Sequence, residues 1–314
     1  MNPVFLYGGD GRLNLPDRVC VPGRTPTAPN DERTDDVLLR RTIRAAAAIS
    51  LTEDEFVRRV RACGTSLEAR FDLNAAGGLD TVGGIVGYTA RWRAKGERGR
   101  AVTDTALSAD ARLSELRRGW RGGPEAQIKA ITQWSHPGGC PIASRDTIGL
   151  TAPRLWMRGL NDAFDFRAGL LEYRPQETQA WAWAGARLTG LTALWAQRLE
   201  PGVGPITAAS EALAILTWRL DARRRPEHPT PACDLSRAAY VLGHLGVQDA
   251  MCEGLLYGQL IASIRVVARA FRDRGELKTQ SALEHSVLRP LTRVRSRLQT
   301  EAGLPDALDD GTRP

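Results

Sequence analysis

The spacing of apolar side chains between residues 37 and 121 changes more than once, and each change predicts a different element. Residues 52–64 carry apolar side chains at helical spacing. Thr52 and Glu55 are placed as in a capping box, and Gly64 suits the left-handed residue that ends a helix. The pattern therefore predicts a short helix with defined ends.

The segment after this helix has the two-residue period of a strand. Residues 66–73 alternate apolar and polar positions, which is typical of a half-buried strand. Residues 82–92 and 100–105 are rich in strand-forming residues, and residues 107–120 return to helical spacing with Ser108 as the cap. We therefore expect a small α+β unit organised as helix, hairpin and helix.

From about residue 150 onward the periodicity is helical throughout. Prolines in first turns and glycines at breaks separate the helices, which are joined by short loops. The predicted helices span residues 151–171, 175–199, 205–224, 234–274 and 276–300, the last with a kink at Pro290. This pattern predicts an antiparallel helical bundle, and the whole chain is expected to be α+β but mostly α.

Composition divides the chain into five expected parts. Residues 1–36 are expected to be an irregular N-terminal arm, and residues 37–121 the small α+β domain. Residues 122–150 are expected to be a linker that contains a short helix, with Ile128 and Ile131 facing inward. Residues 151–300 form the predicted bundle domain, and the acidic residues 301–314 a disordered tail.

The helix predicted over residues 37–50 has one apolar face and one basic face. Its apolar positions, expected to point toward the core, are Leu38, Leu39, Ile43 and Ala46. The helical spacing places Arg40, Arg41 and Arg44 largely on the other side.

Charge adds a hypothesis about the partner. The 314 residues have a net charge of +7, and lysine occurs at only three positions, which leaves 40 arginines among 43 basic residues. A GC-rich genome would explain the preference for arginine over lysine, but it does not explain the net positive sign. Arginine donates two hydrogen bonds at once to a phosphate, so nucleic acid is the expected partner.

Several other classes of protein are disfavoured. The five cysteines are odd in number and contain no C-x-x-C pair, so neither a disulfide framework nor a zinc ribbon is expected. His136 and Cys140 could begin a metal site, but a turn with a buried thiol is the favoured interpretation. No secretion signal and no run of 18 apolar residues is found, so we expect a cytoplasmic protein with no membrane contact and no cofactor.

Short motifs in the first unit resemble those of a known family. They are the alanine-rich run after Arg44, EFVRRVRACG at residues 55–64, VGY at residues 86–88 and LSELRRGW at residues 113–120. Together they are similar to the region that follows the nuclease core in actinobacterial relaxase/mobilization proteins. Those proteins then continue into a long helical region rich in alanine and arginine. The resemblance covers residues 38–120 and implies a role in plasmid transfer.

The chain departs from that family in the residues that cut DNA. Relaxases nick DNA with a tyrosine and a histidine cluster that holds a divalent metal. The four histidines here are at least 16 residues apart in sequence, and Tyr7 is the only tyrosine before Tyr88. If the kinship holds, the chain is a relative that does not nick, and we expect no enzymatic activity.

Two stretches are the candidate nucleic-acid-binding sites. The first is a basic hairpin that includes Trp92, and the second lies on the last two helices; a solvated helix face is the alternative for both. The candidate residues are Arg91, Arg93, Lys95, Arg98 and Arg100 in the hairpin, and Arg265, Arg269, Arg272, Arg293 and Arg297 in the helices. Tryptophans at 156, 181, 183, 195 and 218 could stack on bases, but their spacing favours core packing.

Two functions follow from these observations. The first is a non-catalytic, DNA-associated accessory protein of plasmid mobilization, with a nicking enzyme or a transfer-complex protein as a further partner. The alternative is a helical-bundle protein for protein interaction or structure, whose basic character has no nucleic-acid role.

Overall fold

The computed structural model describes residues 6–7, 13–14, 32–72, 84–94, 97–120, 122–135, 152–218, 234–244 and 250–301. Within these residues the protein is mostly α-helical with a small antiparallel sheet, as predicted. In the predicted N-terminal arm, two short strands, β1 (Leu6–Tyr7) and β2 (Leu13–Asn14), pair with each other. The predicted tail beyond residue 301 and the pair His136 and Cys140 lie outside the described residues.

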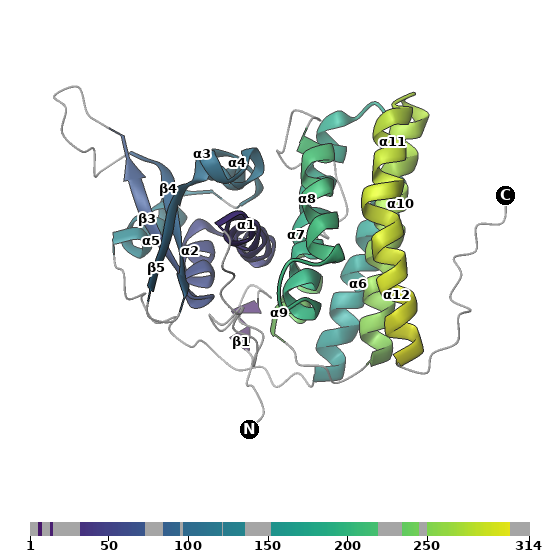
Figure 1. Cartoon of the computed structure of the whole chain (residues 1–314), viewed down its shortest axis with the longest axis horizontal. Helices are drawn as coiled ribbons and strands as arrows, with labels where there is room; N and C mark the ends of the chain where they lie inside the picture. The colour runs from purple at the N-terminus through teal and green to yellow at the C-terminus, as the bar shows by residue number, and fades with distance from the viewer. Residues whose placement is uncertain are drawn as a thin grey trace.

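Helices surround a three-stranded sheet at one end of the molecule (Figure 1). The sheet order is β3-β4-β5, and both pairs of strands are antiparallel. The elements of this unit are α2 (Glu53–Ala62), β3 (Thr65–Phe71), β4 (Ile85–Ala94), β5 (Glu97–Thr103), α3 (Asp104–Leu107), the 3₁₀ turn η1 (Ala109–Ala111), α4 (Leu113–Gly119) and α5 (Pro124–Ser135). The predicted helix and strands are therefore present with boundaries close to those expected.

The register of the sheet places its apolar positions on one face. Leu67 pairs with Ala90 and Ala69 with Tyr88, so alternate residues of both strands point into one core. The Tyr88 hydroxyl donates a hydrogen bond of 2.6 Å to the carbonyl of Ala111, which ties the sheet to η1. Burial raises the pKa of Tyr88 well above its ordinary value, so this hydroxyl remains a donor.

Helix α1 (Glu32–Ile49) packs against both halves of the molecule. Leu39 and Ile43 belong to the core of the sheet unit, whereas Ala45, Ala48 and Ile49 belong to the core of the bundle. The bundle side of α1 approaches α7 closely, because a Cβ on Gly190 would lie only 2.4 Å from that of Ala48. The glycine is therefore required for this contact, and α1 joins the two cores.

The remaining helices form the bundle, with α10, α11 and α12 at the end opposite the sheet (Figure 1). They are α6 (Ala152–Leu170), α7 (Thr178–Leu199), α8 (Pro205–Trp218), α9 (Ser236–His244), α10 (Ala250–Asp273), α11 (Leu277–Leu283), the π-helical turn η2 (Glu284–Leu288) and α12 (Arg289–Glu301). Trp156, Trp181, Trp183 and Trp195 are buried in this core, which confirms the packing interpretation for these four.

The bundle contains one detail that sequence spacing did not predict. Arg274, which follows α10, donates a hydrogen bond of 3.2 Å to the carbonyl of Pro175, which follows α6. The two C-terminal ends therefore lie together, and these packed neighbours run in the same direction. Gly275 has φ +79° and ends α10 as the sequence predicts.

Three local predictions were wrong. The Thr52 side chain makes no capping hydrogen bond; instead Glu55 accepts one of 2.9 Å from the backbone N–H of Leu51. The single helix predicted over residues 107–120 is instead divided into η1 and α4, and the Asp104 carboxylate accepts a hydrogen bond of 3.1 Å from the backbone N–H of Leu113, where α4 begins. Ile128 points outward, because α5 turns its buried side, with Ala130 and Trp134, toward the sheet unit.

Helix α10 is also long and apolar enough to cross a membrane by length and composition. The most apolar 18 residues within Met251–Asp273 have a mean hydropathy of 1.2, and 61% of this stretch is buried inside the protein. A helix that is mostly buried in the core of a bundle is also long and apolar enough to meet this criterion, because apolar neighbours cover it.

Candidate nucleic-acid interface

The arginines of α10 lie on the face of that helix that points away from the core. Arg265, Arg269 and Arg272 are spaced by four and three residues, so they form one stripe along the helix, and all three are exposed. The opposite face carries Ile264 and Phe271, which are buried in the bundle. Burial of the apolar face therefore sets which way the arginines point.

Helix α12 carries a second row. Arg289, Arg293 and Arg297 recur every four residues and are exposed. The two helices are in contact, because a Cβ on Gly258 of α10 would lie 3.6 Å from the guanidinium of Arg295 in α12. The five helical residues that the sequence singled out therefore lie on two neighbouring helices, and the contact between these helices is made at Gly258, seven residues before Arg265. We call the exposed set Arg265, Arg269, Arg272, Arg289, Arg293 and Arg297 the arginine face.

Near Pro290, where the sequence predicts a kink, the structure has a π-helical turn. Proline has no backbone N–H, so it cannot complete the hydrogen-bond ladder of the preceding turn. The π-helical turn η2 lies immediately before α12, where this donor is missing. Leu288 and Leu291 on either side of the proline remain buried, so the row of arginines starts from a fixed point of the bundle.

The residues of the arginine face differ in how far acidic groups compensate them. Arg272 lies 3.3 Å from Asp273, and both side chains are exposed. Among the side chains that the structure describes, which in α12 end at Arg297, none forms an ion pair with Arg269, Arg289, Arg293 or Arg297. Arg274 is different, because its side chain is only 8% exposed, lies over the Phe271 ring at 4.5 Å from the centroid and pairs with Glu276 at 2.8 Å. Four guanidinium groups are therefore left facing solvent.

The hairpin candidates are placed less favourably. Arg91 is half-buried and lies 3.7 Å from Glu68, and Arg100 is exposed but lies 3.8 Å from Asp36. Trp92 is buried in the core of the sheet unit, so it is not available to stack on a base. The backbone register pairs Arg93 with Arg98 directly across β4 and β5. Lys95 and the side chains of Arg93 and Arg98 lie outside the described parts of the chain.

The two candidate regions do not form one surface. The β4–β5 hairpin belongs to the sheet unit at one end of the molecule, and α10 and α12 lie at the other end (Figure 1). Helices α1, α7 and α8 stand between them. One short stretch of duplex therefore cannot be expected to contact both regions of the same molecule.

The arginines of α1 were expected to lie away from the core, and this prediction was wrong. Arg44 is buried and donates to both carboxylate oxygens of Asp110, at 2.6 and 3.0 Å, and also to Glu211. Arg40 donates to the same Glu211 at 2.8 Å. Although burial acts to lower the pKa of Arg44, the two carboxylates raise it above its ordinary value. These arginines join η1 of the sheet unit to α8 of the bundle.

Arg41 is held in a different way, by backbone carbonyls and one side-chain hydroxyl. Its guanidinium donates a hydrogen bond of 2.7 Å to the carbonyl of Gly202 and one of 3.2 Å to the hydroxyl of Thr207, at the start of α8. The Glu200 carboxylate accepts hydrogen bonds from the backbone N–H of Thr207 and from its hydroxyl, and so caps the same helix. Burial lowers the pKa of Arg41, partly offset by Glu200. No sequence pattern had indicated this arrangement.

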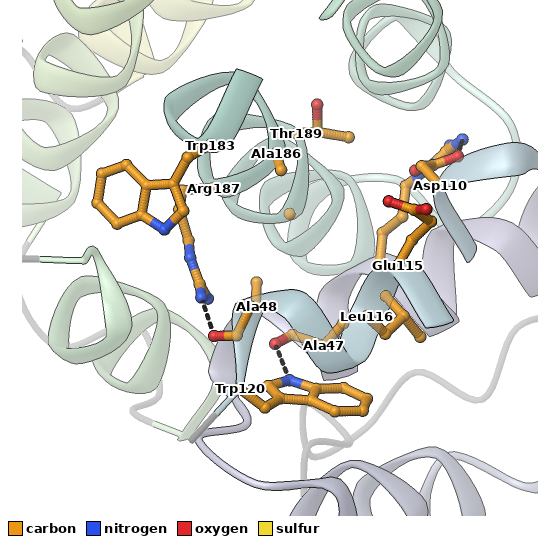
Figure 2. Close-up of a pocket in the computed structure, with 13 residues that line it drawn as sticks. Ala47, Ala48, Asp110, Glu115, Leu116, Trp120, Trp183, Ala186, Arg187 and Thr189 are labelled. Atoms are coloured by element: carbon orange, nitrogen blue, oxygen red, sulfur yellow. Dashed lines mark hydrogen bonds and ion pairs between the residues drawn. The ribbon is translucent and has the colours of Figure 1, made fainter. Parts of the chain in front are cut away.

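A small cleft of about 60 Å³ lies in the same seam, between α1, α4 and α7 (Figure 2). Arg187 crosses the cleft and donates a hydrogen bond of 2.6 Å to the carbonyl of Gly119. The Trp120 indole donates one of 3.5 Å to the carbonyl of Ala47. The Trp183 indole nitrogen is buried without a hydrogen-bond partner in the structure. The volume suits two or so water molecules, and one of them could accept from this nitrogen.

Buried ionisable groups elsewhere have structural explanations. Asp162 of α6 accepts bonds of 3.1 Å from the backbone N–H groups of Arg237 and Ala238, in the first turn of α9. Burial raises the pKa of Asp162 to about 6, although these bonds act in the opposite direction. Within the described residues, no group of three or more His, Cys, Asp or Glu side chains is arranged to hold a metal ion.

Comparisons with family models, with curated proteins and with solved structures give no match for this chain.

Proposed function

We propose that this protein binds nucleic acid without cutting it, through the arginine face of α10 and α12. The observation that carries the proposal is the set of four exposed guanidinium groups on adjacent helices that have no acidic partner among the described residues. Exposed like charges held on a rigid frame repel one another, and a polyanion that binds them relieves the repulsion.

The geometry of the two rows suits phosphates. Arg265 to Arg272 span about 10 Å along α10, and Arg289 to Arg297 span about 12 Å along α12, at ~1.5 Å per residue. Successive phosphates on one strand of a duplex are about 3.4 Å apart along the axis, so each row extends over roughly three or four phosphates. Contacts of this kind fix the position of a protein on the backbone and carry no base sequence.

The hairpin provides a second, separate contact. The backbone register sets Arg93 of β4 opposite Arg98 of β5, so two of the candidate basic residues occupy paired positions near the end of the hairpin. Because the hairpin and the arginine face lie at opposite ends of the molecule, they would contact two separate segments of nucleic acid.

The motif resemblance supports a more specific role. The motifs at residues 55–64 and 113–120 are similar to the region that follows the nuclease core in plasmid mobilization relaxases. We therefore assign the protein to plasmid mobilization as a non-catalytic accessory, acting beside a separate nicking enzyme or transfer-complex protein in the cytoplasm.

The deciding experiment measures binding as a function of salt. Fluorescence anisotropy with single-stranded and double-stranded 30-mers of unrelated sequence should show saturable binding whose logarithm falls linearly with the logarithm of salt concentration. A variant with the four changes Arg269→Gln, Arg289→Gln, Arg293→Gln and Arg297→Gln should lose affinity, and its salt slope on duplex DNA should be smaller by up to about 3.6, at ~0.9 per lost phosphate contact.

The matched control carries the same change at four other exposed arginines, Arg112, Arg118, Arg154 and Arg237. The control should bind nearly as well as the unmodified protein. Equal losses in both variants would mean that net charge, and not the arginine face, determines binding. If the unmodified protein gives no binding at 50 mM salt, the protein-interaction alternative is favoured. Relaxation of supercoiled DNA with Mg²⁺ or Mn²⁺ would contradict the non-catalytic part of the proposal.

A further inference from the structure

Helix α6 carries an exposed apolar stripe. The exposed fractions are 49% for Met157, 39% for Phe164 and 62% for Leu171, the residue that follows the helix. The three residues are spaced by seven, so they lie on one line along the helix. Asn161 and Ala168, also exposed, fill the positions between them.

The other side of α6 is already occupied. Leu155, Leu160 and Phe166 are buried in the bundle core, where α6 packs against α9 and α10. Single exposed apolar residues are normal on a protein surface. A line of three on one helix is different, because together they make a mainly apolar strip about 20 Å long at ~1.5 Å per residue, interrupted only by Asn161.

Charges are ordered along the same exposed side. Arg154 and Arg158 lie in the first half of α6, whereas Asp165 lies in the second half and Glu172 just beyond its end, and all four are exposed. Among these four residues the sign of the charge reverses from one end of the strip to the other; Arg167, half-buried in the last turn, is an exception and lies over the Phe164 ring at 5.8 Å from its centroid. A surface of this kind is complementary to a copy of itself turned end to end.

We propose that two copies of this chain associate through α6, with the two helices antiparallel about a two-fold axis close to Phe164. In this arrangement Met157 of each copy meets Leu171 of the other, and the two Phe164 rings meet at the axis. Arg158 lies beside Glu172 of the second copy, and the symmetry produces this pair twice. A two-fold contact of this kind closes on itself and gives a dimer, not a filament.

The size of the contact limits its strength. Helix α6 has 19 residues, which is about 28 Å, and one helix pair of this length is near or below the ~1,000 Å² expected of a stable biological interface. The expected dissociation constant is therefore in the micromolar range. The axis also places Asp165 near its own symmetry mate, which weakens the dimer further.

The proposal does not depend on nucleic-acid binding, so it is tested on the full chain without nucleic acid. Sedimentation velocity from about 1 to 200 μM should show a concentration-dependent shift from monomer to dimer. Phe164→Glu should abolish the shift, because it places a charge in the centre of the strip. The matched control is Ile215→Glu on α8, at a site that is 60% exposed, and it should dimerise like the unmodified protein. Circular dichroism should show both variants folded.

Charge exchange identifies the partner as a second copy in the antiparallel orientation. Arg158→Glu alone should weaken the dimer about tenfold, and Arg158→Glu with Glu172→Arg should restore it. Asp165→Asn should strengthen it a few-fold. A protein that stays monomeric at 200 μM, a control that loses the dimer as fully as Phe164→Glu, or a double exchange no better than the single one would each overturn the proposal.

Discussion

Two sets of arginines in this protein have the same helical spacing and opposite surroundings. Arg40 and Arg44 in α1 are one turn apart, as are Arg265 and Arg269 in α10. The α1 pair is held by Asp110 and Glu211 between the sheet unit and the bundle, whereas Arg269 faces solvent. The difference shows that what the neighbouring elements place opposite a guanidinium determines its role, and that spacing alone does not.

The energetic consequences also differ. A buried ion pair contributes little net stability, because desolvation of both groups offsets their attraction, but removal of one partner leaves a buried charge uncompensated. An exposed arginine can be replaced at almost no cost in stability. The α1 set is therefore expected to respond in unfolding experiments, and the arginine face in binding experiments.

The largest expected effect is on stability. Arg44→Met should lower the free energy of unfolding by about 3–5 kcal/mol, because Asp110 and Glu211 lose a buried counter-charge. Urea denaturation would measure this, with Arg293→Met as the exposed control, which should change stability by less than about 0.5 kcal/mol. Adding Asp110→Asn and Glu211→Gln to Arg44→Met should recover much of the loss. Equal effects at positions 44 and 293 would remove the distinction between the two sets.

Salt should separate the two sets in a second way. Raising NaCl from 0.05 to 0.5 M should weaken nucleic-acid binding about 10³-fold or more, if at least four phosphates are neutralised. The free energy of unfolding should change little over the same range, because buried pairs such as Arg44 and Asp110 are screened much less. Anisotropy and urea denaturation in matched buffers test this together, and affinity that does not depend on salt would contradict it.

Asp162 extends the comparison to a buried charge that backbone N–H groups hold. Asp162→Ala should cost about 1–2 kcal/mol, since α9 loses a cap on its first turn. Because burial raises the pKa of the folded state to about 6, above ~3.9 for an unfolded Asp, stability should fall as pH rises from about 4 to about 6. Asp162→Asn should remove this slope. Urea denaturation at pH 4.5, 5.5 and 7 measures it, and an unchanged slope in the variant would assign the titration to another group.

The smallest expected effect lies within the arginine face. Arg272 already lies beside Asp273, whereas Arg293 has no acidic partner among the described residues. Arg293→Gln should therefore lower nucleic-acid affinity several-fold and reduce the salt slope by about 1, and Arg272→Gln should do less. Anisotropy titrations of the two variants side by side would show the order, and the reverse order would mean that ion pairing does not set the contribution of each arginine.

Sequence periodicity predicted the elements well where burial is decided by one neighbour. The alternation over residues 66–73 gave the inward face of β3, and the spacing in α10 gave its core side and its arginine row. Gly64 and Gly275 have φ +78° and +79°, as their positions at helix ends required. These features depend on contacts close in sequence or on one repeated pattern.

Apart from the Thr52 cap and the helix expected over residues 107–120, the errors occurred where the deciding contact is distant in sequence. Arg44 is buried because Glu211, 167 residues away, meets it in the fold, and no local pattern contains that information. Trp92 lies in the hairpin that the sequence marked as basic, but its position in β4, paired with Thr65 of β3, turns it into the core of the sheet unit. For the candidate interface, the sequence supplied the residues, and only the fold showed that the two basic stretches lie at opposite ends.

The position of α1 between the two cores affects how the chain folds while it is being synthesised. Its bundle side, with Ala45, Ala48 and Ile49, is covered by α7, which begins about 130 residues later. At the usual rate of translation this separation lasts on the order of ten seconds, during which the sheet unit can form but half of α1 has no cover. A ribosome-bound chain that stops before α7 should therefore attract chaperones, and release should come only when α7 emerges.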